Sequence, residues 1–424
     1  MCKTPSPLRR STAPGHRLLV LSPFPPRRDA RHGGGRAIAQ LLERLSERNQ
    51  IALLCLRAPD EPPVDEVLAT RLECAEEVRC ASRGTSALHR IRGIVGDYAG
   101  LLRGTPSWVR GLRSSAFAHR VHAVAAAWRP DVIQLEYPVM GQYLGVLREL
   151  GAPRVLVEHD VAVAAARELR QRRRGSARLR AEGELIAWKR FEGSLLRQVD
   201  AVVVFTERDA AAVRELDADA RLAIVPLAAN VPEQPLDPVG ESPSRLLFVG
   251  SFVHEPNVDA AVRLVRDVFP RLRDAFPDLV LDLVGHAIPG EVRALAGPRI
   301  CIHGDVPDVT PYLERASVVV APIQLGGGAR VKVLEALAAG KAVVVTERAV
   351  EGIAASPGEH FLLAETDEEF AAAAAELLRN PARRAELGEA AYSWARESVS
   401  WDRSATSLER LYSSLIAERS ARTT

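Results

Sequence analysis

The chain has 424 residues, of which 47% are hydrophobic and 26% are charged. This ordinary composition excludes general disorder and a collagen-like or coiled-coil rod, and no apolar run approaches the roughly 18 residues of a membrane-spanning helix. Residues 1–10 lack the apolar core of a secretory signal, and the five cysteines form no C-x-x-C pair. We therefore expect a cytoplasmic protein with reduced thiols and neither a disulfide framework nor a zinc site.

The net charge of +2 hides an asymmetry between the two halves of the chain. Residues 1–230 carry 36 lysines and arginines against 26 acidic residues, whereas residues 231–424 carry 20 against 28. A basic first half favours anionic partners or an anionic membrane surface.

The first half is predicted to alternate strands and helices. Arg17–Ser22 is a short apolar run typical of a buried strand, Gly33–Gly35 forms a glycine loop, a helical pattern starts near Ile38, and Ile51–Leu56 is the next strand. This order predicts a βαβ unit and a parallel sheet. Four later strands are predicted at Val132–Leu135, Val155–Glu158, Ala201–Phe205 and Leu222–Val225.

Five prolines between residues 226 and 243 predict a linker, after which the alternation restarts. The second set of strands is predicted at Arg245–Gly250, Leu279–Gly285, Ile300–His303, Ser317–Ala321 and Ala342–Thr346, followed by a helical tail from Asp367 to about Glu418. We expect an α/β protein with two Rossmann-like lobes that face a central cleft. The expected parts are a first domain over 1–226, a linker over 227–243, a second domain over 244–400, and a final helix over 401–424 that crosses back to the first domain.

The segment Gln324–Gly340 leads from a strand through three glycines into a helix. Helix N-termini present unpaired N–H groups and partial positive charge, which suit phosphate. Arg330 and Lys332 lie in the first turn, where cations oppose the helix dipole, so an anionic ligand explains them better than local stability. Glu335, three residues after Lys332, could accept two hydroxyl hydrogen bonds from a ribose. The alternative is a plain glycine turn with solvated charges, and neither Walker A nor G-x-G-x-x-G is matched.

At this segment a family resemblance appears. The second half resembles the nucleotide-sugar domain of GT-B glycosyltransferases, specifically family GT4. The segments that carry it are FVGSFVHEPNVDA (248–260), DLVG (282–285), HGDVPDVTPYL (303–313) and APIQLGGGARVKVLEALAAGKAVVVTERAVEGI (321–353). The first half is similar to the acceptor lobe of the family through SPFPP…GGGRAIAQLLERL, DVIQLEYP, LVEHDV and DAVVVFTERD.

The resemblance implies the GT-B fold and transfer of a sugar from a nucleotide diphosphate sugar, with retention of configuration and usually without a metal. It implies that the Gly326–Gly328 turn and the helix after it bind the donor diphosphate, and that Glu335 binds the ribose as the second glutamate of an E-x7-E signature. The first glutamate is replaced by Gly327. The basic pair of G-R-x-x-x-x-K is replaced by Ser251 and Pro256. Our hypothesis is that Arg330 and Lys332 supply the missing charge.

Further candidates lie at predicted strand ends. The resemblance places His159 near the transferred sugar, against the alternative of a histidine satisfied in its turn by neighbouring acids. Glu136 follows another strand and is expected to face the same cleft if the sheet is parallel. The remaining donor candidates are Gly34, Gly35, Ser251, Asn257 and Glu351, with His254 and His286 as weaker ones.

The sequence offers no metal site that we favour. Asp217-Ala218-Asp219 is formally D-x-D, but it lies in a helix-to-strand connection and is interpreted as solvated acids. We expect no cofactor beyond the nucleotide sugar as co-substrate. The charge on the leaving diphosphate then has to be stabilised by Arg, Lys and helix N–H groups.

The run Arg167–Arg180 holds seven arginines and one glutamate. It is either a solvated helix face or a peripheral contact with an anionic membrane. Nucleic-acid binding fits poorly, because aromatic residues make up only 5% and no binding motif is present.

The sequence therefore predicts a glycosyltransferase that builds a polysaccharide, a glycolipid or a metabolite precursor. The alternatives are a nucleotide-sugar epimerase on the same fold and a non-catalytic sugar-nucleotide-binding module. An NAD-dependent dehydrogenase is less favoured.

Overall fold

The computed structural model describes residues 15–30, 33–59, 61–80, 104–226, 228–306, 308–325 and 331–423. The chain divides into two compact units. The first is formed by residues 1–225 together with 405–424, and the second by residues 226–404. Each unit is described by itself.

Within the described residues, the first unit is built on a seven-stranded sheet in the order β3-β2-β1-β4-β5-β6-β7. Every neighbouring pair of strands is parallel. The strands are β1 (Arg17–Ser22), β2 (Gln50–Arg57), β3 (Cys74–Arg79), β4 (Val132–Glu136), β5 (Arg154–Val157), β6 (Ala201–Val204) and β7 (Leu222–Ile224). The parallel sheet predicted for this half is confirmed. Edge strand β3, which carries charged residues, was missed.

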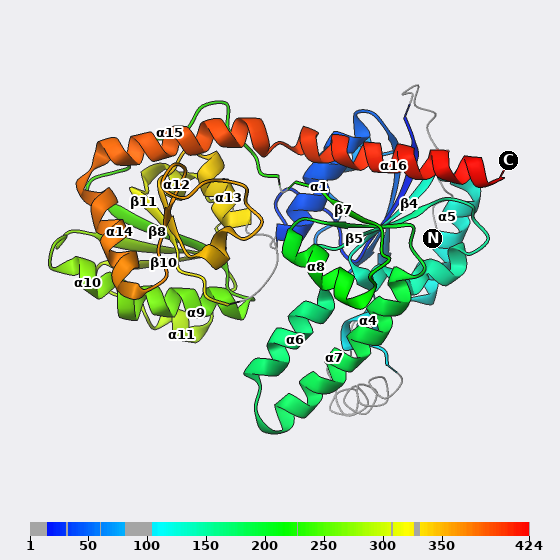
Figure 1. The fold of residues 1–424 in the computed structure, drawn as a ribbon, viewed down its shortest axis with the longest axis horizontal. Coiled ribbons are helices and arrows are strands. Elements are labelled where there is room, and N and C mark those ends of the chain that lie inside the picture. Colours follow the sequence, from blue (N-terminus) through cyan, green and yellow to red (C-terminus); the bar gives the residue numbers. More distant parts are fainter. Residues whose placement is uncertain are drawn as a thin grey trace. The chain divides into compact units, whose positions relative to one another are not determined.

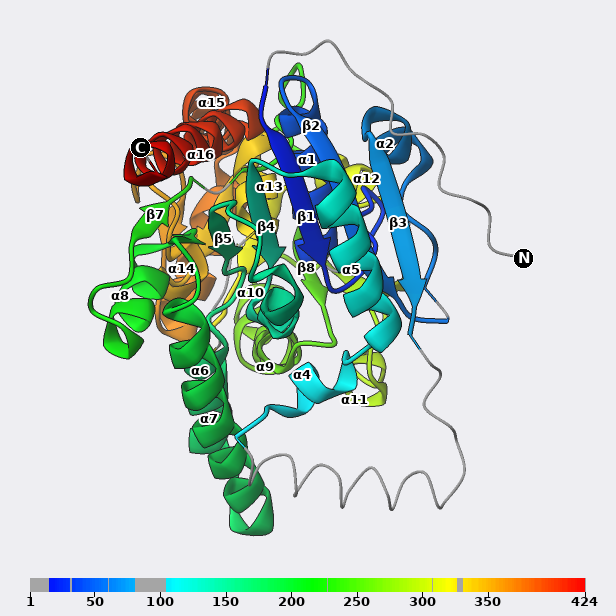
Figure 2. The ribbon, with the colours of Figure 1, turned by 90° about the vertical axis from the view of Figure 1, so that its right-hand side faces the viewer.

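Helices cover both faces of this sheet, as Figure 2 shows for α1 and α5. On the α5 side, Leu19 and Leu21 of β1 share one buried cluster with Phe117 and Val121. The helical segments are α1 (Gly33–Ser46), α2 (Glu66–Arg71), α4 (Ser107–Gly111), α5 (Ser115–Trp128), η1 (Pro138–Leu147), α6 (Ala162–Arg172), α7 (Gly175–Leu196) and α8 (Glu207–Leu216).

The last helix, α16 (Trp401–Thr423), belongs to the first unit from Ala405 onward. Its Tyr412 is fully buried. At the helix surface Glu409 pairs with Arg48 at 3.0 Å, and Glu418 pairs with Arg221 at 2.7 Å. The chain thus leaves the second unit and ends on the first.

Helices α6 and α7 form a hairpin that projects from the first unit (Figure 1). The base of the hairpin is fixed by Glu192 of α7, which accepts hydrogen bonds from the backbone N–H groups of Ala162 and Val163, both at 2.8 Å. A carboxylate here satisfies N–H groups that the first turn of α6 would otherwise leave unpaired. The Arg167–Arg180 run spans the far end of this hairpin.

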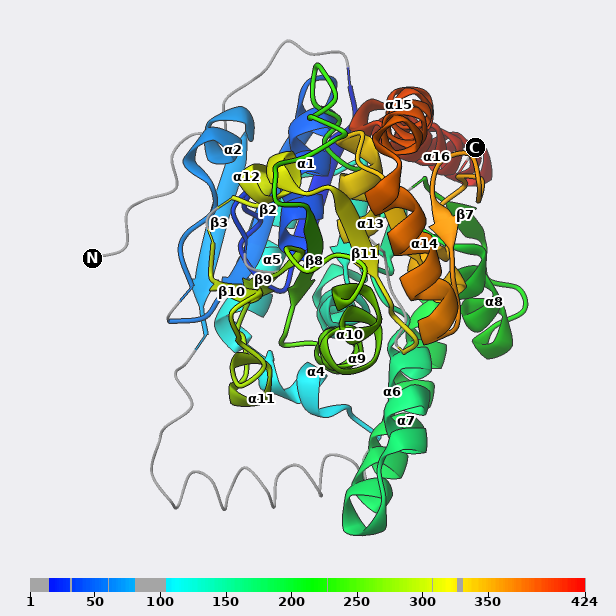
Figure 3. The ribbon, with the colours of Figure 1, turned by 90° about the vertical axis from the view of Figure 1, so that its left-hand side faces the viewer.

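The second unit contains, among the described residues, a six-stranded parallel sheet in the order β10-β9-β8-β11-β12-β13. Figure 3 shows β8, β9, β10 and β11 beside the helices that pack on them. The strands are β8 (Arg245–Ser251), β9 (Val280–His286), β10 (Ile300–Gly304), β11 (Val318–Ala321), β12 (Val343–Val345) and β13 (Leu362–Leu363). The helical segments are α9 (Glu255–Arg263), η2 (Leu264–Val268), α10 (Phe269–Arg273), α11 (Gly290–Arg293), α12 (Thr310–Arg315), α13 (Val331–Ala338), η3 (Glu347–Val350), α14 (Asp367–Arg379) and α15 (Pro381–Ser398).

The proline-rich segment expected to be a linker is instead part of the second unit. Leu236 donates its backbone N–H to the carbonyl of Ala339 at 2.9 Å, and the Tyr392 hydroxyl donates to the carbonyl of Pro232 at 2.9 Å. These contacts lie within the second unit, so the prolines stiffen a packed segment and do not separate domains.

No helix among the described residues is long and apolar enough to cross a membrane.

Candidate functional site

His159 lies just beyond the carboxyl end of β5, beside the end of β4. Its Nε2 is 2.6 Å from Oε2 of Glu136, the last residue of β4. Adjacent parallel strands end at the same edge of the sheet, which is the usual place for ligands in such folds. The two residues predicted as catalytic are thus in direct contact.

Glu136 does not face an open cleft as the sequence led us to expect, because it is fully buried. Its other oxygen, Oε1, accepts a hydrogen bond from the side-chain amide of Gln134, which is also fully buried. The catalytic role predicted for Glu136 stays a prediction. In this structure its carboxylate contacts the imidazole of His159 and not an open surface.

Apart from Tyr137, no sequence pattern indicated the aromatic residues that form a wall around His159. The ring of Tyr137 stacks on the imidazole with centroids 4.4 Å apart. The ring of Phe205 is tilted against the imidazole, with centroids 5.4 Å apart. Phe24 and Trp108 in turn meet Tyr137 edge-on, at 5.4 and 5.6 Å. Such a wall excludes water from one side of His159 and offers apolar faces for a sugar or an aglycone.

Tyr137 also has an unusual backbone, with φ of 68°. A positive φ is uncommon for a bulky residue and is often found at functional sites. Here the left-handed residue turns the chain directly after β4, so that the ring lies over His159. The only sequence signal for the position of Tyr137 was that it follows a glutamate at the end of a strand.

Gly34 and Gly35 form part of the first turn of α1, which begins at Gly33. A Cβ placed on Gly34 would lie 1.9 Å from the hydroxyl oxygen of Tyr137. The glycine is thus needed for the close approach of Tyr137 to this turn. The role predicted for the two glycines, contact with a donor diphosphate, stays a prediction.

Two buried carboxyl groups lie behind His159, at the base of the α6–α7 hairpin. Glu158 is almost fully buried, its Oε2 has no hydrogen-bond partner among the described residues, and burial raises its pKa well above the ordinary value. Glu192 is also buried, and burial raises its pKa to about 7 although its two backbone hydrogen bonds oppose the rise. We assign the proton of this pair to Glu158, because Glu192 accepts two N–H groups that stabilise a carboxylate.

In the second unit, three predicted donor residues meet at the carboxyl end of β8. The Lys332 ammonium donates to Oδ1 of Asn257, and Nδ2 of Asn257 donates to the backbone carbonyl of Ser251 at 2.7 Å. The ammonium also lies 5.2 Å from the ring centre of Phe248. Burial, together with the charge of Lys332, lowers the pKa of the nearby His254.

This cluster places a cation at the start of α9, where the sequence has lost the basic pair of the resembled motif. Asn257 of α9 binds Lys332 and is itself bonded to the carbonyl of Ser251 on β8, although the lysine comes from α13, 75 residues further along the chain than Asn257. A fixed cation beside a helix N-terminus is suited to a phosphate group.

The other predicted donor-binding residues lie partly within and partly outside the described residues. Glu335 lies one turn after Lys332 on α13 and is half-buried. Glu351 follows η3 and pairs with Arg348 at 3.8 Å. Gly326, Gly327, Gly328 and Arg330 lie outside the described residues.

One group among the described residues has the donor atoms for a metal ion, namely Asp282, Cys301 and His303 on β9 and β10. Asp282 is already engaged, since it accepts from Arg245 at 2.6 Å and from His303 at 2.9 Å. The arginine neutralises the carboxylate, so the geometry fits an Arg–Asp–His network better than a metal centre.

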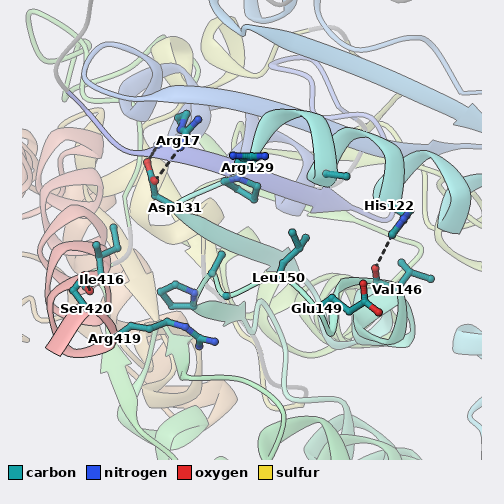
Figure 4. Close-up of a pocket in the computed structure, with 15 residues that line it drawn as sticks. Arg17, His122, Arg129, Asp131, Val146, Glu149, Leu150, Ile416, Arg419 and Ser420 are labelled. Atoms are coloured by element: carbon teal, nitrogen blue, oxygen red, sulfur yellow. Dashed lines mark hydrogen bonds and ion pairs between the residues drawn. The ribbon is translucent and has the colours of Figure 1, made fainter. Parts of the chain in front are cut away.

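A cavity of about 900 Å³ lies at the end of the first sheet where strands β1 and β4 begin, opposite the end that carries His159 (Figure 4). Its wall includes Arg17 at the start of β1 and Asp131 just before β4. The side chains of these two residues form an ion pair at 3.5 Å. Arg129, also in the wall, is the C-terminal cap of α5. A cation there complements the negative end of the helix dipole, so a bound anion is not needed to explain it.

Comparisons with known proteins agree with this geometry. Residues 32–228 match the family model of the glycosyl transferase 4-like domain, and residues 243–380 match that of glycosyl transferases group 1. The chain belongs to the group 1 glycosyltransferases. The family prediction of GT4 is confirmed, and the two Rossmann-like lobes are those of the GT-B fold.

A phosphatidyl-myo-inositol mannosyltransferase from Mycobacterium tuberculosis is 35% identical to this glycosyltransferase over 108 residues, which is 24% of this chain and 28% of the relative. The match therefore spans less than a third of that curated relative.

Two solved structures share the fold over nearly the whole chain. Sucrose-phosphate synthase from Thermosynechococcus elongatus has a TM-score of 0.70 at 18% identity, covering 95% of this chain and all of that one. Anabaena HepE in complex with UDP and glucose has a TM-score of 0.61 at 11% identity, covering 93% and 99%.

Proposed function

We propose that this glycosyltransferase takes its sugar from a nucleotide diphosphate sugar and transfers it with retention of configuration and without a metal ion. The single observation that carries the proposal is the Lys332–Asn257–Ser251 cluster at the start of α9. The UDP complex of the structurally similar Anabaena protein supports a donor of this class.

The chemistry of the departing group explains why Lys332 matters. Breaking the bond to the anomeric carbon leaves a second negative charge on the terminal phosphate of the diphosphate, and a positioned cation stabilises that charge more in the transition state than in the ground state. Asn257 holds the ammonium in place, so little reorganisation is needed when the charge develops. Arg330 and the Gly326–Gly328 turn are proposed to complete the diphosphate site, and Glu335 to bind the ribose.

His159 is proposed to act beside the reacting sugar. Its imidazole is fixed on one side by the carboxylate of Glu136 and on another by the ring of Tyr137. An imidazole held in this way can orient a sugar hydroxyl or accept a proton from the acceptor.

The donor proposal is tested by calorimetry with UDP and GDP. Lys332→Ala should weaken binding of the preferred nucleotide by about 1.5–3 kcal/mol, the usual value of a charge-assisted hydrogen bond. Lys189→Ala, which removes an exposed lysine of α7, is the matched control and should change nothing. Equal affinity in the Lys332→Ala protein would remove this residue from the site. Activity that disappears with EDTA and returns with Mn²⁺ would contradict transfer without a metal.

We further propose that the tip of the α6–α7 hairpin contacts an anionic membrane, so that the acceptor is carried by a lipid. Within the run, Arg167, Arg170 and Arg172 pair with Glu215, Glu182 and Glu168. Exposed pairs of this kind contribute only about 0–1 kcal/mol each, so lipid phosphates can replace the carboxylates.

Apolar exposure at the tip adds to this argument. Leu179 is 76% exposed between Arg178 and Arg180, at the start of α7. An apolar side chain among cations is typical of segments that lie at a membrane interface, and each arginine near an anionic surface adds about 1 kcal/mol. The mannosyltransferase relative is named for a phosphatidylinositol, which also supports a lipid acceptor.

Liposome sedimentation tests the membrane contact. Changing Arg172, Arg173 and Arg174 to Gln should release the protein from phosphatidylglycerol vesicles, and Leu179→Ser should weaken binding without a change of charge. The matched control changes Arg266, Arg271 and Arg273 to Gln in the second unit. If the hairpin and control variants sediment equally with the vesicles, the arginine run is a solvated helix face and not a membrane contact.

A further inference from the structure

A line of buried hydrogen bonds joins the C-terminal helix to His159. The Tyr412 hydroxyl of α16 bonds to Oε1 of Gln134 on β4, and Nε2 of Gln134 bonds to Oε1 of Glu136. Oε2 of Glu136 then meets Nε2 of His159 at 2.6 Å. Tyr412, Gln134 and Glu136 are all completely shielded from solvent.

The direction of each bond follows from the atoms involved. A side-chain amide oxygen only accepts, so the Tyr412 hydroxyl must donate its proton to Gln134. The amide nitrogen only donates, so Oε1 of Glu136 must accept. The other oxygen of the same carboxylate, Oε2, is the acceptor that faces Nε2 of His159. The proton between Glu136 and His159 therefore belongs to Nε2 of the imidazole.

We propose that Tyr412 and Gln134 are positioning residues that hold His159 in its Nε2–H tautomer. This inference rests on the proposed role of His159 beside the reacting sugar. The hydroxyl of Tyr412 fixes which way the Gln134 amide points, and that orientation keeps a donor on Glu136. With Nε2 occupied by Glu136, Nδ1 is the nitrogen left to accept a proton or a hydrogen bond from a substrate.

Without the Tyr412 hydroxyl the Gln134 amide loses this constraint. If the amide rotates, its oxygen meets the Glu136 carboxylate, and two acceptors then face each other in a buried place, which is costly. The carboxylate of Glu136 then no longer presents a fixed acceptor to Nε2 of His159. The imidazole is released to the Nδ1–H tautomer or to a mixture of tautomers, and the Nδ1–H form has lost the acceptor.

Loss of the hydroxyl need not detach the helix. The Arg48–Glu409 and Arg221–Glu418 pairs also fix α16 on the first unit, and a phenylalanine keeps the buried ring. Tyr412→Phe therefore tests the hydrogen bond separately from packing. Tyr392→Phe is a matched control, because it also removes a hydrogen-bonded hydroxyl from a buried tyrosine, but in the second unit, where the hydroxyl donates to backbone carbonyl oxygens.

The first measurement is the ¹⁵N spectrum of protein labelled at its ten histidines, with the His159 signal assigned by loss in His159→Asn. We expect the Nε2–H signature in the wild type and in Tyr392→Phe, and Nδ1–H or a tautomer mixture in Tyr412→Phe. An unchanged Nε2–H signature in both Tyr412→Phe and Gln134→Met would overturn the proposal.

The second measurement is release of nucleoside diphosphate from the preferred sugar nucleotide. Tyr412→Phe should lower kcat about five- to tenfold with KM changed less than twofold, the effect of one lost hydrogen bond on orientation rather than on binding. Adding Tyr412→Phe to Gln134→Met should lower kcat no further, because both changes break the same line. Additive losses would mean separate structural effects and would count against the proposal. If His159→Asn retains full activity, the proposed role of His159 fails, while the spectrum still decides what sets its tautomer.

Discussion

The ring of Tyr137 lies flat against that of His159, with an interplanar angle of 23° and centroids 4.4 Å apart. The contact joins the chain segments that directly follow β4 and β5, where the candidate site of the first unit lies. Its position depends on a turn of α1 that is distant in sequence, since Gly34 leaves the space that the Tyr137 hydroxyl occupies.

Gly34→Ala should therefore disturb the orientation of the His159 imidazole indirectly, through Tyr137. The new methyl group would lie 1.9 Å from the Tyr137 hydroxyl oxygen, so the tyrosine must move and the stacking must loosen. We expect kcat to fall by about tenfold or more, since small displacements in an active site have such effects. Gly145→Ala is the control, because a Cβ there meets nothing within 4 Å. Equal steady-state kinetics for the two variants would show that Tyr137 does not position His159.

Glu158→Gln should remove part of the pH dependence of stability. Because burial raises the folded-state pKa of Glu158, the folded protein keeps a proton that the unfolded chain releases above about pH 4.5. The free energy of unfolding therefore falls as the pH rises above about 4.5. Glutamine resembles the protonated acid and carries no charge at any pH, so this fall should be smaller in the variant than in the wild type.

Hydrogen exchange of the β5 amides at pH 5 and pH 8 measures this effect locally. The exposed Glu149→Gln is the matched control and should follow the wild type. A Glu158→Gln protein that loses as much protection as the wild type would contradict a protonated Glu158. Glu192→Gln should behave differently and destabilise α6, because an amide has one oxygen for the two N–H groups that Glu192 accepts.

The strands that are buried on both faces could be predicted from the sequence because their apolar runs are continuous. β1 was predicted at its observed bounds, Arg17–Ser22. β3 could not be found in this way, since it is an edge strand of half-buried residues in which Glu76 and Glu77 pair with Arg120 and Arg57.

The sequence pointed to parts of the candidate site by different routes. Glu136 was predicted from the end of its strand, His159 from its strand end together with the family resemblance, and Lys332 from the glycine-to-helix turn. Tyr412 could not be inferred, because it meets Gln134 across 278 residues of sequence. The packing of the proline-rich segment was hidden for the same reason, since the partner of Pro232 is Tyr392, 160 residues away.

Glu335→Gln should distinguish a ribose contact from a phosphate contact. A carboxylate accepts from both ribose hydroxyls, whereas an amide accepts at one oxygen, so UDP or GDP should bind about 1–2 kcal/mol more weakly. Inorganic pyrophosphate lacks the ribose and should bind equally well to both proteins. Calorimetry with the two ligands checks this. A parallel loss for pyrophosphate would mean that Glu335 acts through the diphosphate site instead.

Lys341→Met should change how the stability of the second unit depends on pH. Lys341 is fully shielded, its ammonium donates to the backbone carbonyls of Asp237 and Glu314, and burial lowers its pKa to about 8. Between about pH 8 and 10.5 the unfolded chain binds a proton that the folded protein has lost, so the free energy of unfolding of the wild type rises with pH in this window. We expect a gain of about 1–2 kcal/mol between pH 7.5 and 9.5 that is absent from the variant.

Hydrogen exchange of the β12 amides, measured across this pH range, tests the prediction. The exposed Lys189→Met is the control, and it separates the effect of Lys341 from that of other groups that titrate in the same range. A wild-type slope that persists in Lys341→Met would show that another group carries it. The variant should also loosen the segment around Asp237, because the ammonium joins the carbonyl of Asp237 to that of Glu314 in α12. Faster exchange at Val239, in the segment that the sequence predicted to be a linker, would be the local sign of that loosening.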